Sequence, residues 1–62
     1  MPYVNIRVAG KLSRTQKAEI SKGVTEVIAR VAEKPPESIL IFIDELEHDN
    51  IAKAGILLKK PS

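Results

Sequence analysis

The chain has 62 residues, of which 44% are hydrophobic, and ten basic against eight acidic residues give a formal net charge of +2. This length allows one domain, residues 1–62. Burial of its apolar surface (roughly 90 kcal/mol) only balances the cost of ordering the chain (roughly 90 kcal/mol), so we expect a marginal monomer. The sequence has no cysteine and one histidine, which excludes disulfides, thiolate zinc sites and multi-histidine metal sites. Self-association is the remaining route to stability.

Composition also disfavours several other classes of protein. No apolar run approaches the roughly 20 residues of a membrane span, and the first residues lack the charged and apolar regions of a signal peptide. We therefore expect a cytoplasmic protein that binds no membrane. A net charge of +2 and an aromatic content of 3% give little basis for binding nucleic acid.

The first predicted element is a strand near the N-terminus. Within residues 3–8, Val4, Ile6 and Val8 alternate with more polar residues, and Gly10 ends the pattern. A period of two is typical of a strand with one buried face.

A helix is predicted next, over about residues 14–33. Ser13 and Gln16 have the spacing of a capping box, and Pro35 and Pro36 stop the helix. Five apolar side chains recur on a stripe about 100° wide, which we expect to face the sheet. They are Ile20, Val24, Val27, Ile28 and Val31.

The second predicted strand begins with five consecutive apolar residues, 39–43, which indicates burial on both faces. The helix covers one face, and we expect another copy of the chain to cover the other. Strand, helix and strand of these lengths predict a β-α-β unit with parallel strands, of the α/β (α+β) class. Alternation sends Asp44 and Glu45 to opposite faces, and we interpret them as a solvated strand end. Residues 51–58 predict a short loop or hairpin.

Pro2 has the most distinctive chemistry in the sequence. Methionine before proline is commonly removed in cells, and Pro2 would then carry a free secondary amine. An apolar site disfavours the charged form and lowers the pKa of such an amine, which makes it a suitable general base beside a carbonyl. If Met1 is retained, the nitrogen is a non-basic amide. The alternative interpretation is that Pro2 simply starts an edge strand.

A Met-Pro-Tyr-Val-Asn-Ile start on a chain of this length resembles the 4-oxalocrotonate tautomerase family. The likeness also includes residues 13–17, 25–27, 41–45 and 54–55. The resemblance implies a β-α-β subunit with a short C-terminal hairpin, assembled into dimers and a hexamer. It also implies an amino-terminal proline that acts as general base without metal or cofactor.

Three positions depart from the pattern of this family. Leu12 and Leu40 stand where the family has arginines that bind substrate carboxylates, and Ile51 stands where it has an aromatic pocket residue. Lys11, beside Leu12, is the candidate for binding a substrate oxygen or carboxylate. The resemblance thus implies a tautomerase for a small enol or 2-keto acid, with Pro2 as catalytic base and these four residues around the substrate.

Two alternatives stay open. The same proline chemistry also suits hydration or dehalogenation of activated double bonds. The changed pocket positions also fit a non-catalytic oligomeric assembly module that kept the fold. His48 has only acidic neighbours in sequence, and we interpret it as an exposed turn histidine rather than a metal ligand.

Overall fold

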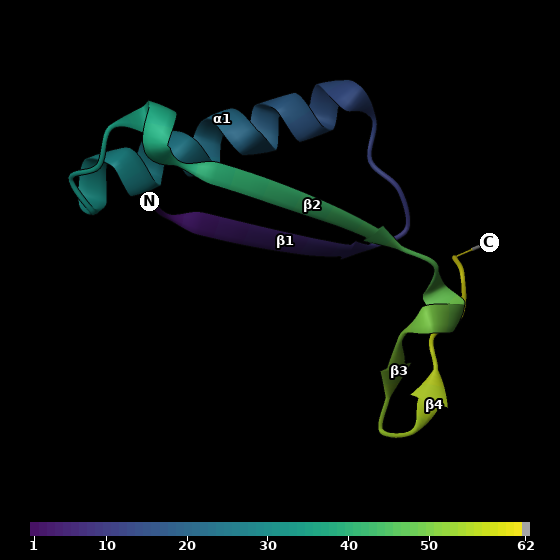
Figure 1. Cartoon of the computed structure of the whole chain (residues 1–62). Helices are drawn as coiled ribbons and strands as arrows, with labels where there is room; N and C mark the ends of the chain where they lie inside the picture. The colour runs from purple at the N-terminus through teal and green to yellow at the C-terminus, as the bar shows by residue number, and fades with distance from the viewer. Residues whose placement is uncertain (62) are drawn as a thin grey trace.

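The computed structural model describes residues 1–61, which form a β-α-β unit followed by a hairpin (Figure 1). The predicted fold class is thereby confirmed. In chain order the elements are β1 (Tyr3–Ala9), α1 (Arg14–Val31), a 3-10 turn (Pro36–Ser38), β2 (Leu40–Leu46), a second 3-10 turn (His48–Asn50), β3 (Ala52–Lys53) and β4 (Ile56–Leu57).

The two long strands are parallel, and their register runs from Tyr3 opposite Leu40 to Ala9 opposite Leu46. Strand alternation gives this sheet two faces. The inner face lies under α1 and carries Val4, Ile6, Val8, Ile41, Ile43 and Glu45. The outer face is uncovered in one chain and carries Tyr3, Asn5, Arg7, Leu40, Phe42 and Asp44.

Both ends of α1 have identifiable caps. The Ser13 hydroxyl accepts from the Gln16 amide N–H (3.1 Å), and the Gln16 side chain accepts from the Ser13 N–H (2.8 Å), which confirms the predicted capping box. The helix ends two residues earlier than predicted because Glu33 takes a left-handed φ of 54°. The Lys34 N–H then donates to the Ala29 carbonyl (3.1 Å), as in a Schellman motif. Within residues 1–61 no helix is long and apolar enough to cross a membrane.

The apolar stripe of the helix is only partly covered by the sheet. Ile20, Val24 and Ile28 are half-buried, as predicted, whereas Val27 and Val31 are 50% and 69% exposed. The prediction was wrong for these two valines because neighbouring strands lie only about 4.8 Å apart, while a helix is about 10 Å across. One flank of the stripe therefore extends past the edge of a two-stranded sheet.

The chain by itself has almost no fully buried core. Among the described residues, Ile39 alone counts as buried, with 9% of its surface exposed. The accessible surface is 5147 Å², against about 4,000 Å² for a compact monomer of this mass. The radius of gyration is 14.5 Å, against about 10.6 Å for a compact 62-residue domain. The structure thus agrees with the expectation that one chain is not a self-sufficient globule.

The predicted hairpin is present as β3 and β4, which pair antiparallel. The two residues between the strands, Ala54 and Gly55, have φ angles of 52° and 80°. Two successive positive φ angles are typical of a type I′ turn, whose twist matches that of the flanking strands. The hairpin projects away from the β-α-β unit, beyond the C-terminal ends of β1 and β2 (Figure 1).

Candidate active site

Pro2 lies at the start of β1 and is held against the start of β2. Its carbonyl accepts a hydrogen bond from the Leu40 N–H (3.0 Å), which continues the parallel ladder by one residue. Pro2 is half-buried, whereas Met1 before it is 71% exposed. The backbone of Pro2 is therefore fixed, and the residue that precedes it extends into solvent.

The outer face beside Pro2 is aromatic and aliphatic. Tyr3 is 69% exposed, Leu40 42% and Phe42 51%, and the rings of Tyr3 and Phe42 lie 6.4 Å apart between centroids, tilted by 42°. Further along the same face the surface becomes polar, because Asp44 accepts a hydrogen bond from Asn5 (3.1 Å) and pairs with Arg7 (3.4 Å). The end that carries Pro2 is thus the apolar end of this face.

The other predicted site residues divide into two groups. Leu40 lies beside Pro2 through the backbone hydrogen bond just described. Lys11 and Leu12 lie in the loop after β1, at the opposite end of the strand from the N-terminus (Figure 1). A strand rises about 3.3 Å per residue, so that loop is about 25 Å from Pro2 of the same chain. Ile51 lies at the base of the hairpin, on the same distant end, where its carbonyl accepts from the Leu58 N–H (2.9 Å).

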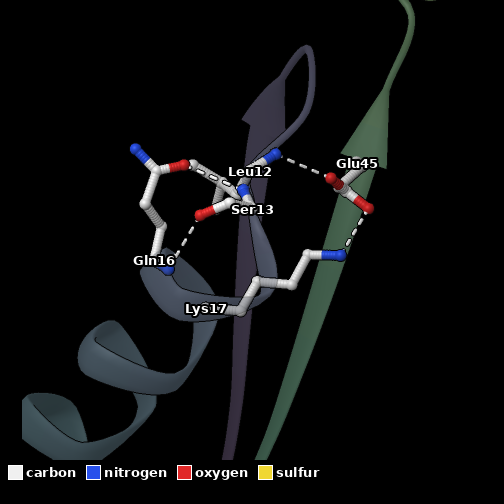
Figure 2. Close-up of polar contacts among 5 residues, drawn as sticks. All are labelled: Leu12, Ser13, Gln16, Lys17 and Glu45. Carbon is white, nitrogen blue, oxygen red and sulfur yellow. Dashed lines mark hydrogen bonds and ion pairs between the residues drawn. The ribbon is translucent and has the colours of Figure 1, made fainter.

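The loop of residues 10–13 is held at several points. The Gly10 N–H donates to the Leu46 carbonyl (2.7 Å), and the φ of Gly10 is +99°, a conformation that residues with a side chain rarely adopt. The Leu12 N–H donates to a carboxylate oxygen of Glu45 (2.8 Å), and Ser13 caps the helix (Figure 2). Between these anchors Lys11 is exposed and Leu12 is half-buried.

Glu45 is the best-connected side chain near this loop. One carboxylate oxygen accepts from the Leu12 N–H and the other from the Lys17 ammonium, each at 2.8 Å (Figure 2). The hydrogen bonds from Lys17 and Leu12, and the positive charges of Lys17 and Lys11, lower the pKa of this carboxyl below its ordinary value, although partial burial opposes them. The prediction that Asp44 and Glu45 face opposite sides is confirmed.

The interpretation of Glu45 as solvated agrees with the structure, in which this residue is exposed, but it was incomplete, because the carboxylate also joins β2 to the loop and the helix. A signal for this role was present in the sequence. Strand alternation places Glu45 on the inner face, and Lys17 stands at the fourth position of the predicted helix.

His48 is not the exposed turn histidine that was predicted. It is half-buried, and its Nδ1 atom is buried without a hydrogen-bond partner among the described residues. Its Cε1 atom lies 3.5 Å from the point where a side chain at Gly10 would begin. The ring therefore packs over the start of the loop, because the 3-10 turn that contains His48 follows β2 directly.

Two further features bear on what the chain can bind. Among residues 1–61, no three His, Asp or Glu side chains gather closely enough to hold a metal ion. A shallow hollow of about 250 Å³ lies along the first half of α1, lined by Arg14, Lys17, Ala18 and Ser21. Its lining residues belong to the N-terminal half of α1, which follows the loop of residues 10–13.

Comparison with known proteins decides the family. A family model described as "Tautomerase enzyme" matches residues 2–60. A probable tautomerase of Streptococcus agalactiae serotype III (strain NEM316) is 38% identical over 60 residues, which cover 97% of this chain and 100% of the relative. The chain is a member of the tautomerase family.

Solved structures share the fold of this tautomerase-family chain. YwhB, described as a homologue of 4-oxalocrotonate tautomerase, matches with a TM-score of 0.82 and 31% identity, covering 87% of this chain and 88% of its own. A structure described in connection with trans-3-chloroacrylic acid dehalogenase activity matches with a TM-score of 0.82 and 28% identity, covering 94% and 100%. The resemblance to the 4-oxalocrotonate tautomerase group is thereby confirmed.

Proposed function

We propose that this tautomerase-family chain is a cofactor-free keto-enol tautomerase. Its general base is the secondary amine of Pro2, released by removal of Met1, and its substrate is a small enol or 2-keto acid. The observation that carries the proposal is the position of Pro2. Its backbone is fixed by Leu40 at the apolar end of the outer face, while Met1 is exposed to removal.

The reaction needs two proton transfers, one from the substrate to the Pro2 amine and one from the Pro2 ammonium back to the substrate. The Pro2 amine takes a proton from the carbon next to the keto group, or from the enol hydroxyl, and becomes a secondary ammonium. The C–H or O–H electron pair moves into the enolate, whose negative charge is stabilised by a nearby cation. The ammonium then returns the proton to a different atom of the same substrate, so the overall reaction is balanced without a co-reactant.

The proposed site is shared between copies of the chain. The loop with Lys11 and Leu12 lies about 25 Å from Pro2 of its own chain by the rise of β1, a span that no side chain bridges, and Ile51 follows the C-terminal end of β2. We therefore assign the Lys11 ammonium that faces the enolate, and the apolar walls of Leu12 and Ile51, to neighbouring copies. This agrees with the excess surface of the single chain, and we propose a dimer at least and a hexamer as the full assembly.

The substrate class follows from the side chains available. Leu12, Leu40 and Ile51 offer aliphatic walls that keep the amine poorly solvated, which favours its neutral, basic form. Lys11 offers one cation, enough for one carboxylate or one enolate oxygen. We therefore propose a small substrate with one carboxylate rather than a dicarboxylate.

Proton exchange tests this proposal. In D₂O, the protein should catalyse deuterium incorporation at C3 of 2-oxobutanoate, a small 2-keto acid, followed by NMR. Pro2→Ala should lower the exchange rate by at least about a hundredfold, the range expected for loss of a general base, with an unchanged circular dichroism spectrum. Pro61→Ala, a proline change in the exposed tail, is the matched control. An unchanged rate in Pro2→Ala would contradict the assignment of the base.

A second candidate reaction is favoured by one comparison. The structure connected with trans-3-chloroacrylic acid dehalogenase activity is 28% identical and is covered over its full length. The same amine, once protonated, would then deliver a proton to one carbon of an activated double bond while water adds to the carbon that bears chlorine, and the adduct would lose HCl to form a carbonyl. Chloride release from trans-3-chloroacrylate by the wild-type chain, without exchange at 2-oxobutanoate, would favour this reaction. Inactivity in both assays would favour an assembly module.

A further inference from the structure

We propose that Glu45 is a positioning residue for the candidate active site. Its carboxylate holds the loop of residues 10–13 so that Lys11 and Leu12 present a fixed surface to Pro2 of a neighbouring copy. This inference rests on the proposed function, because it assigns to Glu45 a role in the same shared site.

The geometry of the contacts supports a positioning role. Each oxygen of the Glu45 carboxylate has its own donor, the Leu12 N–H on one side and the Lys17 ammonium on the other, both at 2.8 Å (Figure 2). A carboxylate that accepts two well-formed bonds is restrained in direction as well as in distance. The loop is thereby tied both to β2 and to the first turns of α1.

The loop has few other restraints at this point. Gly10 is bonded to Leu46 at the end of β2, and Ser13 belongs to the helix cap. Lys11 lies between Gly10 and Leu12, so the backbone on both of its sides is fixed only while Leu12 is held. Without Glu45 the Leu12 N–H loses its partner, and an unpaired amide favours rearrangement of the loop toward water.

Charge explains why an acidic residue suits this position. Lys11 and Lys17 both attract the Glu45 carboxylate, and these interactions lower its pKa, so it stays ionised at neutral pH. Lys11 itself stays exposed. A neutral residue at position 45 would remove the negative charge that attracts both lysines.

The alternative role for Glu45 is a purely structural ion pair, and the two contacts can be separated by substitution. Lys17→Met removes the ion pair and keeps the bond to Leu12. Glu45→Gln also loses the ion pair, yet its amide oxygen can still accept from the Leu12 N–H. Glu45→Ala removes both contacts. Only the last change should disturb the loop if the bond to Leu12 is what positions it.

Kinetic constants for deuterium exchange at 2-oxobutanoate test this proposal. Glu45→Ala should raise KM about tenfold, a modest value within the cost of a misplaced contact, with kcat within about twofold of wild type. Glu45→Gln should raise KM much less, and Glu19→Ala, a change at an exposed helix residue, should leave both constants unchanged. If Glu45→Ala does not fold, Glu45→Asp replaces it, because a side chain shorter by one methylene draws the carboxylate away from the Leu12 N–H and should also raise KM.

A wild-type KM in Glu45→Ala would overturn the positioning role. So would KM values that rise equally in Glu45→Ala, Glu45→Gln and Lys17→Met. The second pattern would identify a structural ion pair. Failure of the proposed function is distinguishable from this result. It would appear as full exchange activity in Pro2→Ala, whatever the Glu45 variants do.

Discussion

At the scale of single residues, local backbone geometry sets the ends of α1 and the turn of the hairpin. Glu33 and Ala54 both have left-handed φ angles, of 54° and 52°, although neither is glycine. A left-handed conformation costs an L-residue roughly 1–2 kcal/mol. Each position is thus a place where the chain carries local strain that a different residue would relieve.

Replacing Glu33 with glycine should therefore stabilise the fold. Glu33 stands where helices commonly end in a left-handed glycine, so Glu33→Gly should raise the free energy of unfolding by about 0.5–1 kcal/mol. Urea denaturation followed by circular dichroism measures this change. Ala32→Gly is the control, because Ala32 has an ordinary φ of −88° and gains nothing from glycine. A stability gain in the control equal to that of Glu33→Gly would refute this account of the helix end.

Residue-level prediction from the sequence depends on local patterns. Pro2 was selected because it directly follows Met1, whose removal would free its amine, and its role as general base stays a prediction. His48 and Glu45 could not be assigned, because their surroundings come from segments distant in the sequence. The ring of His48 packs over Gly10, and the carboxylate of Glu45 meets Leu12, 33 residues away. No pattern in the sequence indicates the contact of His48. For Glu45, strand alternation and the place of Lys17 in the helix indicate the shared face but not the bond to Leu12.

At the scale of elements, the Glu45 carboxylate joins β2 to the loop and to α1. Hydrogen bonds and positive charges from Lys17, Leu12 and Lys11 lower its pKa below the ordinary value of 4.5. A lowered pKa in the folded state means that ionised Glu45 stabilises the fold at any pH above 4.5. That contribution is lost as the pH falls through the lower pKa of the folded chain.

The stability of wild type and Glu45→Gln should therefore converge in acid. Wild type should be the more stable at pH 7, and the gap should shrink below pH 4.5, where Glu45 becomes protonated in both the unfolded and the folded chain. Urea midpoints measured from pH 3 to pH 7 give the comparison, with Glu19→Gln as the control. A gap of the same size at pH 3 and pH 7 would rule out the ionic part of this contact.

Element-level prediction was accurate where short-range rules apply. The alternation of residues 3–8 and the capping box at Ser13 placed the first strand and the start of the helix. The buried stripe was less well predicted, since Val27 and Val31 are exposed. Helical periodicity shows which residues share a face, but the width of the sheet beneath that face is a property of the assembled elements.

At the scale of the whole molecule, the single chain is an incomplete unit. Its surface is about 1,100 Å² larger than that of a compact monomer of the same mass, a difference that approaches the area of a stable protein interface. The outer face carries Tyr3, Leu40 and Phe42 in the open. We propose that another copy of the chain covers this face and completes the Pro2 site.

A charge introduced on the outer face should dissociate the proposed oligomer into single chains. Activity should be lost with the same change. Phe42→Asp replaces one ring of the exposed Tyr3–Phe42 pair with a carboxylate. Burial of this charge against another chain would be costly. We expect a monomer in sedimentation velocity and loss of exchange at 2-oxobutanoate. Lys34 is exposed after α1, and Lys34→Asp should leave the mass of the assembly and the exchange activity unaltered. A monomeric Phe42→Asp with wild-type kcat/KM would show that one chain contains a complete site.

The most direct measurement of the central claim is the intact mass of the protein made in cells, before and after treatment with a small halogenated 2-keto acid. We expect a chain lighter by one methionine that gains a single adduct, with peptide mapping placing the adduct on Pro2. Such a result demonstrates a free, nucleophilic amine at this position. A chain that keeps Met1 and gains no adduct would contradict the account, because the nitrogen of Pro2 would then be an amide with no basic lone pair.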